Sequence, residues 1–230
     1  MKLLVLDVEG TLFQTTTRLE GTEYNSTIWQ EIASRLGPNA IHEEVETHKR
    51  WNNNAYKGYI EWMRDTIAIH IRYGLSQNMF FDIIDKAVYS SNVVETLLRV
   101  DRSKYELLLI SGGFRELAAR AQKDIGIHHC FAASEYIFDE KGTLASYNLL
   151  PCDFEGKIDF IKLMLREYKL GENDWLFIGD GANDVPIARY SPISIGFQPH
   201  PKLKDVSTYN IEDFKELFDI LNLDLTCHGG

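Results

Sequence analysis

The chain has 230 residues, and its 34 acidic and 24 basic side chains give a net charge of −10. An acidic surface argues against nucleic acid or an anionic membrane as the main partner, whereas a small anionic substrate can still bind at a locally positive site. No apolar run approaches the roughly 18 residues of a membrane span, and the apolar run before Asp7 is too short for the core of a signal peptide, so we expect a cytoplasmic protein.

The first predicted element is a buried strand at 3–6, with the sequence LLVL, which stops at Asp7. Short apolar runs without polar alternation are typical of strands that are buried on both faces of a parallel sheet. Glu9 follows two positions after Asp7, and alternate residues of an extended chain point to the same side. The two carboxylates can therefore face one substrate, one as nucleophile and the other as general acid and base.

The next part of the chain has no buried-strand pattern. Three stretches show helical periodicity and are punctuated by glycines, namely STIWQEIASRLG, YIEWMRDTIAIHIRYG and SQNMFFDIIDKAVYSS. We therefore expect a small helical cap at 15–89, inserted after the first strand into a core that consists of 1–14 and 90–230.

Strands and helices alternate in the rest of the chain. The runs ELLLI at 106–110 and WLFI at 175–178 predict buried strands, and SIGF at 194–197 predicts a short fourth one. FRELAARAQKDIG and GKIDFIKLMLREYKLG have helical periodicity, the second with Gly171 as its expected C-cap. This alternation predicts an α/β fold with a doubly wound parallel sheet. FAASEYIFDEKGTLASYNLL, with two β-rich runs around a turn, predicts a β-hairpin flap.

Groups suited to a phosphate follow the predicted strands. Ligands of doubly wound sheets bind beyond the carboxyl ends of the strands, so groups far apart in sequence converge there. Ser111 is predicted to cap a helix, with the amides of Gly112 and Gly113 as an anion-binding helix start. Lys157 lies at another predicted helix start and can reach the phosphate as a point charge.

Carboxylates that face a phosphate repel it unless cations intervene. LFIGDGANDVPIA places Asp180 and Asp184 after a strand, where they can approach Asp7. An oxygen-only pocket of this kind suits Mg²⁺, which takes few carboxylates and keeps several waters.

Taken in order, DVEGT, SGG, Lys157 and GDGAND resemble the motifs of the haloacid dehalogenase-like (HAD) hydrolase superfamily. The wording ISGGF and GDGAND, the helical insertion and the hairpin resemble its phosphoserine phosphatase-like branch, over nearly the whole chain. The resemblance implies a Rossmann-like core and an Mg²⁺-dependent phosphomonoesterase. Such an enzyme hydrolyses a small phosphorylated metabolite through an aspartyl-phosphate intermediate.

The resemblance also implies a role for each motif residue. Asp7 is the implied nucleophile and a metal ligand, and Glu9 the general acid and base whose backbone carbonyl also binds the metal. The groups implied to hold the phosphoryl group are Ser111, Gly112, Gly113 and Lys157, the last also counted as catalytic. The remaining implied positions are Asp180 as a metal ligand, Asn183 as a phosphate or substrate contact, and Asp184 as a metal-water ligand that orients Lys157.

Two positions depart from the family pattern. Glu9 replaces the usual aspartate, which keeps the chemistry and adds one methylene of reach. Thr66 stands where an ungapped match places the cap arginine that grips the phosphoserine carboxylate, so phosphoserine is predicted to be a poor substrate.

Other functions stay open beside this one. A phosphotransferase or mutase can use the same intermediate. A non-enzymatic, phospho-receiver-like module is disfavoured by the chain length, the helical insertion and the D-x-E spacing. A module that only binds substrate is disfavoured by the intact Asp7, Lys157 and Asp180.

Overall fold

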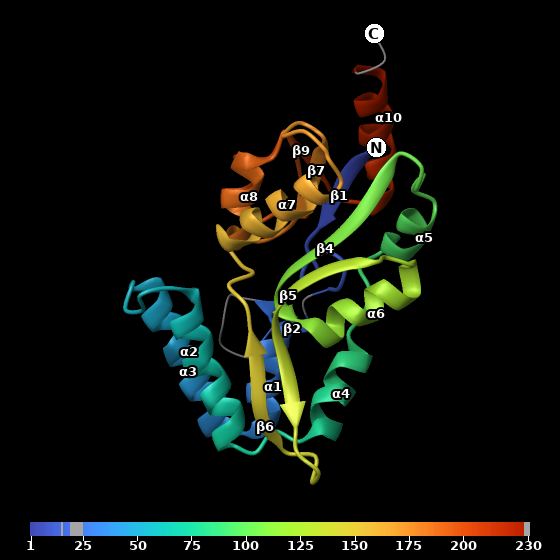
Figure 1. Cartoon of the computed structure of the whole chain (residues 1–230). Helices are drawn as coiled ribbons and strands as arrows, with labels where there is room; N and C mark the ends of the chain where they lie inside the picture. The colour runs from blue at the N-terminus through green and yellow to red at the C-terminus, as the bar shows by residue number, and fades with distance from the viewer. Residues whose placement is uncertain (15, 19–24, 228–230) are drawn as a thin grey trace.

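The computed structural model describes residues 1–14, 16–18 and 25–227, and it contains a seven-stranded sheet with helices on both faces (Figure 1). The strand order is β6-β5-β4-β1-β7-β8-β9, and every neighbouring pair is parallel except β5 and β6. The strands are β1 (Lys2–Leu6), β4 (Tyr105–Phe114), β5 (His129–Phe138), β6 (Leu144–Leu149), β7 (Trp175–Gly179), β8 (Ile193–Phe197) and β9 (Tyr209–Ile211). The predicted doubly wound α/β fold and the β5–β6 hairpin are confirmed.

The position of β1 in the middle of the sheet explains why its sequence is apolar without alternation. Leu3 and Val5 pack on one face with side chains of α7 (Gly156–Glu167) and α8 (Val185–Tyr190). Leu4 and Leu6 pack on the opposite face with α5 (Val93–Leu98), α6 (Arg115–Ile125) and α10 (Leu217–Cys227). Both faces are therefore buried, as a parallel sheet between two helical layers requires. The short helical turns are η1 (Ala182–Asp184), α9 (Pro201–Lys204) and η2 (Phe214–Glu216).

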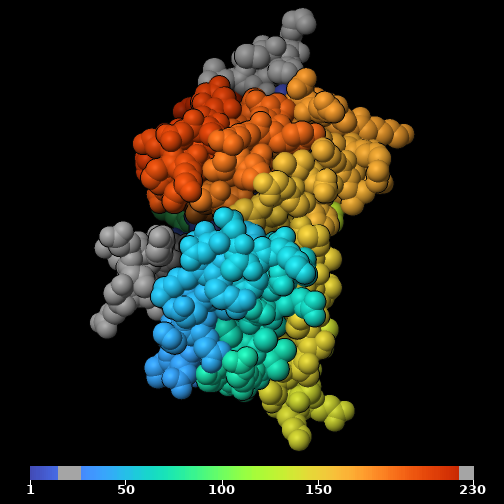
Figure 2. All heavy atoms as spheres, turned by 90° about the vertical axis from the view of Figure 1, so that its left-hand side faces the viewer, coloured from blue at the N-terminus to red at the C-terminus, as the bar shows by residue number. Residues whose placement is uncertain are grey.

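Four helices separate β1 from the helix that precedes β4. They are α1 (Ile28–Leu36), α2 (Pro38–Asn52), α3 (Tyr59–Arg72) and α4 (Gln77–Lys86), and they lie beside the extended β5–β6 hairpin (Figure 1). Figure 2 shows the α2–α3 side of this layer against the segment that leads into α7. The three predicted helical stretches are α1, α3 and α4, whereas α2 and the antiparallel pair β2 (Thr16–Arg18) and β3 (Asn25–Ser26) were not predicted. Within the described ranges, no helix is long and apolar enough to cross a membrane.

The predicted helix start at Ser111 was wrong. β4 continues to Phe114 and α6 begins only at Arg115, so Ser111 caps no helix. The register with β5 shifts between Ser111 and Phe114, which indicates a β-bulge at the two glycines. The glycine amides therefore belong to an irregular strand end rather than to a helix N-terminus.

The predicted C-cap at Gly171 was also wrong. α7 ends at Glu167, and Lys169 adopts a left-handed conformation with φ of 55°. Lysine is an uncommon residue for this conformation, which is why the glycine two positions later was the more obvious candidate.

Candidate active site

A fully buried ammonium group lies at the carboxyl end of β1. Lys157 is in the first turn of α7, and its Nζ lies 2.6 Å from Asp7 Oδ1 and 2.7 Å from Asp184 Oδ1. Burial by itself lowers the pKa of Lys157, but the carboxylates of Asp184 and Asp7 overcome this and hold it well above its usual value. A charged ammonium thus joins the polar ends of β1 and β7.

Three carboxylates gather at this point. Asp7, Asp180 and Asp184 each offer one oxygen, and these oxygens lie within 4.8 Å of one another. Burial, with the nearby charge of Asp184, raises the pKa of Asp180 to about 7. Burial also raises the pKa of Asp7, against the opposing effect of the ammonium. Three carboxylates beside one ammonium leave this cluster short of positive charge, and its hard oxygen donors fit a divalent cation such as Mg²⁺.

Contacts with neighbouring groups hold the carboxylates of Asp180 and Asp184 in place. Thr11 Oγ1 donates to Asp180 Oδ1 at 2.8 Å, and a β-carbon at Gly10, whose φ is +90°, would collide with the same carboxylate. Asp184 Oδ2 accepts hydrogen bonds from the amides of Asp180 at 3.2 Å and Gly181 at 3.1 Å. Both Asp184 oxygens are therefore engaged, one by backbone and one by the buried ammonium.

The bulge at the end of β4 lies against a carboxylate that the sequence did not single out. Ser111 is buried, and its Oγ accepts a hydrogen bond from the Gly113 amide at 3.0 Å. A β-carbon at Gly112 would collide with the carboxyl group of Asp153. Asp153 Oδ1 in turn accepts from Asn183 Nδ2 at 2.9 Å. Asp153 thus connects the bulge with the loop after β7.

Glu9 lies on the side of the site that faces α1. Its Oε1 accepts a hydrogen bond from the amide of Ile28, the first residue of α1. A β-carbon at Gly113 would lie 3.1 Å from Oε2, so this second oxygen faces the bulge of β4. Burial raises the pKa of Glu9 to about 7, although the Ile28 amide favours the ionised form. A carboxyl group of this kind exchanges its proton near neutral pH.

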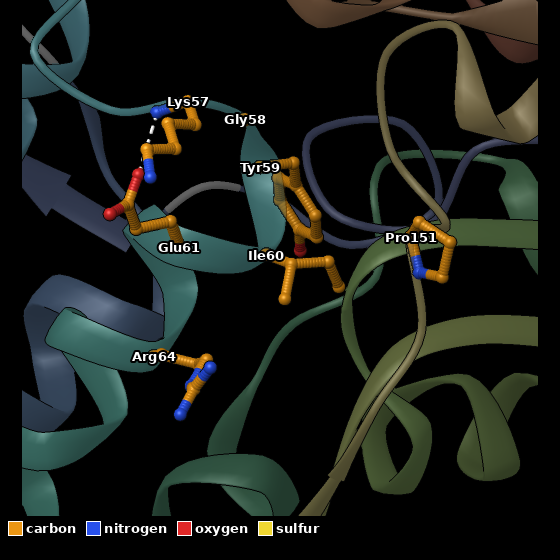
Figure 3. A pocket seen from close by; sticks show the side chains of 7 residues that line it. All are labelled: Lys57, Gly58, Tyr59, Ile60, Glu61, Arg64 and Pro151. Atoms are coloured by element: carbon orange, nitrogen blue, oxygen red, sulfur yellow. Dashed lines mark hydrogen bonds between the residues drawn. The ribbon is translucent and has the colours of Figure 1, made fainter.

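Helix α3 reaches the site through its first residue. The Tyr59 hydroxyl donates a hydrogen bond of 2.7 Å to the carbonyl oxygen of Gly112. Figure 3 shows Tyr59 beside a groove of about 390 Å³ at the junction of α3 with the segment before α7, and Pro151 lies across from it. The groove is lined by Lys57, Gly58, Tyr59, Ile60, Glu61, Arg64 and Pro151.

The position that matched a cap arginine is buried inside the helical layer. Thr66 has no exposed surface, and its Oγ1 lies 3.2 Å from Thr47 Oγ1, between α3 and α2. Arg50 and Arg72 each pair with a carboxylate of α2 or α3 on the surface of the helical layer. Arg64 is exposed and lies on the wall of the groove.

The predicted site residues gather around these contacts: Asp7, Glu9, Ser111, Gly112, Gly113, Lys157, Asp180, Asn183 and Asp184. Sequence reasoning missed Thr11, Asp153 and Tyr59. Thr11 lies within the DVEGT motif, and Asp153 stands four positions before Lys157, so the sequence held a weak indication that both belong to the site. Tyr59 had none, because its contact depends on how the helical layer meets the sheet.

Known proteins resemble this chain along its length. The haloacid dehalogenase-like hydrolase family matches residues 1–191. A phosphoserine phosphatase of Lactococcus lactis is 24% identical over 220 residues, which cover 95% of this chain and 93% of that protein. A phosphoserine phosphatase of Methanocaldococcus jannaschii is also 24% identical, over 94% of this chain and 95% of its own.

Solved structures share the fold. A phospho-aspartyl intermediate analogue of phosphoserine phosphatase superposes with a TM-score of 0.76 at 19% identity, over 95% of this chain and 98% of that one. A substrate-bound phosphoserine phosphatase superposes with a TM-score of 0.75 at 19% identity, over 96% of this chain and 97% of that one. At these identities the likeness concerns the fold, whereas the family match covers more than four fifths of the sequence. With its motifs gathered at one end of the sheet, the chain belongs to the haloacid dehalogenase-like hydrolase family.

Proposed function

We propose that the protein is a Mg²⁺-dependent phosphomonoesterase that hydrolyses a small phosphorylated metabolite through an aspartyl phosphate on Asp7. The observation that carries this proposal is the fully buried Lys157, whose Nζ lies 2.6 Å from Asp7 and 2.7 Å from Asp184. A buried ammonium is costly unless anionic groups compensate it, and here the compensating groups include the proposed nucleophile. The ammonium therefore lies where the transferred phosphoryl group would be bound. A bound phosphoryl group brings further negative charge.

The carboxylate cluster supports the metal part of the proposal. Asp7 and Asp180 offer oxygens for Mg²⁺, and the backbone carbonyl of Glu9 is proposed as a further ligand. Because both Asp184 oxygens already accept hydrogen bonds, we expect Asp184 to act through a metal-bound water while it holds Lys157. The cation would neutralise phosphate charge beside these carboxylates.

Two carboxyl groups divide the proton and phosphoryl transfers. A carboxylate oxygen of Asp7 attacks phosphorus, forming an O–P bond while the bond to the leaving oxygen breaks. Glu9, with a pKa of about 7, gives its proton to that oxygen. Glu9 then takes a proton from a water that attacks phosphorus. The bond to Asp7 breaks, inorganic phosphate leaves, and both carboxyl groups return to their starting states.

The groups around the bulge of β4 suit the phosphoryl oxygens. The Ser111 hydroxyl, the Gly112 and Gly113 backbone and Lys157 Nζ are the proposed binding groups. Asn183, held by Asp153, is proposed to contact phosphate or substrate. Cationic and neutral donors on one oxyanion are the arrangement that stabilises charge during phosphoryl transfer.

We further propose that 15–89 is a cap domain and that 1–14 with 90–230 is the catalytic core. The cap would exclude water and select the leaving group. The relatives include phosphoserine phosphatases, but Thr66 is buried against Thr47, and Arg50 and Arg72 are paired on the surface. We therefore expect L-phosphoserine to be a poor substrate. A cytoplasmic location stays a prediction.

The test is hydrolysis of p-nitrophenyl phosphate with Mg²⁺, with EDTA and with Ca²⁺, followed by a panel of phosphorylated metabolites that includes phosphoserine. We expect activity with Mg²⁺ only, because Ca²⁺ demands more ligands at longer distances. Adding alcohol acceptors separates hydrolysis from phosphotransfer, since a transferase would form a new phosphate ester. Full activity after exhaustive chelation contradicts the metal site, and phosphoserine as the best substrate contradicts the argument from Thr66.

A further inference from the structure

One peptide unit in the bulge of β4 is held at both of its ends. The Tyr59 hydroxyl donates to the Gly112 carbonyl at 2.7 Å. The amide of the same peptide, which belongs to Gly113, donates to Ser111 Oγ at 3.0 Å. The carbonyl and the N–H of a trans peptide point in opposite directions, so a partner that fixes one end also fixes the other.

This peptide needs an external partner to hold it. It joins two glycines, which have the greatest backbone freedom of all residues, and it lies where the β4–β5 register shifts. On its inner side, the Asp153 carboxyl group packs against the α-carbon of Gly112. The partner of its carbonyl comes from α3, more than fifty positions away in sequence.

The far end of this connection is a proposed phosphate ligand. Ser111 Oγ accepts the Gly113 N–H with one lone pair. A hydroxyl has one donor hydrogen and two acceptor pairs, so the hydrogen stays available for a phosphate oxygen. A rotation of the peptide would take the Gly113 amide away from Ser111 Oγ and let the Ser111 hydroxyl turn toward another acceptor.

Tyr59 can make this contact only while the helical layer lies against the sheet. It is the first residue of α3, and its ring centroid lies 6.4 Å from that of Trp62 and 6.3 Å from that of Phe154, the residue after Asp153. Figure 3 shows its side chain extending from α3 beside the junction with Pro151. The hydrogen bond therefore depends on the arrangement in which α3 lies against the end of β4.

We propose that Tyr59 is a positioning residue that transmits cap closure through the Gly112–Gly113 peptide to the Ser111 hydroxyl. The inference rests on the proposed function in so far as Ser111 binds phosphate. It adds that the phosphate loop reaches its binding geometry only when the cap is closed. In this proposal Tyr59 acts through the peptide and not by contact with phosphate or metal.

The test compares Tyr59→Phe with the wild type, since phenylalanine keeps the ring and removes only the hydroxyl. The loss of one neutral hydrogen bond changes a binding or rate constant by roughly 5-fold. We expect the dissociation constant for inorganic phosphate, measured by calorimetry, to rise about that much, and kcat/KM for p-nitrophenyl phosphate to fall about as much. Tyr73→Phe is the matched control, because its hydroxyl bonds Glu43 at the other end of α3, and it should change neither quantity. An unchanged phosphate affinity in Tyr59→Phe overturns the proposal.

A double-mutant cycle separates positioning from a general loss of packing. If Tyr59 acts through Ser111, the Tyr59→Phe effect on phosphate affinity should disappear in a Ser111→Ala background. Fully additive effects would show that Tyr59 acts elsewhere and overturn the proposal. Calorimetry needs no turnover, so an inactive wild type that still binds phosphate refutes the proposed function, while the comparison of phosphate affinities still tests this inference. Thermal unfolding of each variant confirms that the compared proteins are folded.

Discussion

Replacement of Lys157 by methionine removes the only cation at the carboxylate cluster, within the described residues, and keeps an unbranched side chain that ends one atom short of Nζ. The Nζ atom has no exposed surface and lies 2.6 and 2.7 Å from two carboxylates. At an effective dielectric constant of about 20, each contact is worth about 6 kcal/mol of attraction before desolvation is subtracted. Breaking a buried pair by removing one partner typically costs about 3 to 5 kcal/mol, because a buried charge is left uncompensated.

We therefore expect Lys157→Met to lose about 3 to 5 kcal/mol of unfolding free energy in EDTA at pH 8, measured by urea denaturation. The loss should shrink on acidification, because Asp7, whose pKa is raised by burial, then becomes neutral. It should also shrink with saturating Mg²⁺, which supplies positive charge. Lys123→Met, at an exposed position of α6, is the control and should stay within about 0.5 kcal/mol of the wild type. A loss below about 1 kcal/mol for Lys157→Met, with no dependence on pH, would refute the reasoning.

Three further predictions concern single carboxyl groups. Asp7→Asn should lower kcat by roughly 10³ or more with the fold intact, and retention of a few per cent of the activity would exclude Asp7 as the nucleophile. Because Glu9 must be protonated for the first step, kcat/KM for an alkyl phosphate should fall as pH rises above about 7, and Glu9→Gln should lack this decline. Burial raises the pKa of Glu44 from 4.5 to about 7, so between these values the folded state holds a proton that the unfolded state has lost. Glu44 should therefore contribute about 3 kcal/mol to the stability that the wild type loses as pH rises through this range, and Glu44→Gln should lose about that much less in parallel urea titrations, whereas equal slopes would contradict the burial argument.

The parallel sheet and the convergence of the motifs at one of its ends could be predicted because each depends on a local pattern. β1, β4 and β7 each contain a continuous apolar run, and a strand buried on both faces needs such a sequence. The DVEGT, SGG and GDGAND motifs each begin where an apolar run ends. Neighbouring parallel strands then bring Asp7 and Asp184 to the same edge of the sheet, where one lysine contacts both.

The boundary errors have a different cause. Ser-Gly-Gly before a helical pattern is also the signature of a capped helix start, but the two glycines form a bulge and the helix begins at Arg115. At the end of α7, Lys169 takes the left-handed conformation that a sequence pattern assigns to glycine. In both places tertiary contacts decided between conformations that the local sequence allows.

Contacts that cross between the helical layer and the sheet could not be predicted. The Tyr59 hydroxyl meets a backbone carbonyl, which leaves no pattern in the sequence. Asp153 contacts Gly112 and Asn183 from a loop whose course depends on the whole fold. Thr66 matches an arginine only by alignment, and its burial against Thr47 follows from the packing of α2 on α3.

The central claim is that Asp7 carries the phosphoryl group, and the most direct test uses Glu9→Gln with p-nitrophenyl phosphate. This leaving group needs little protonation, so Asp7 can still be phosphorylated, while the loss of the general base slows hydrolysis of the intermediate. We predict a burst of nitrophenolate stoichiometric with enzyme and, after acid quenching, one phosphoryl group on the peptide that contains Asp7 by mass spectrometry. A phosphoryl group on another residue, or slow turnover by the variant without a burst and without labelled enzyme, would contradict the account.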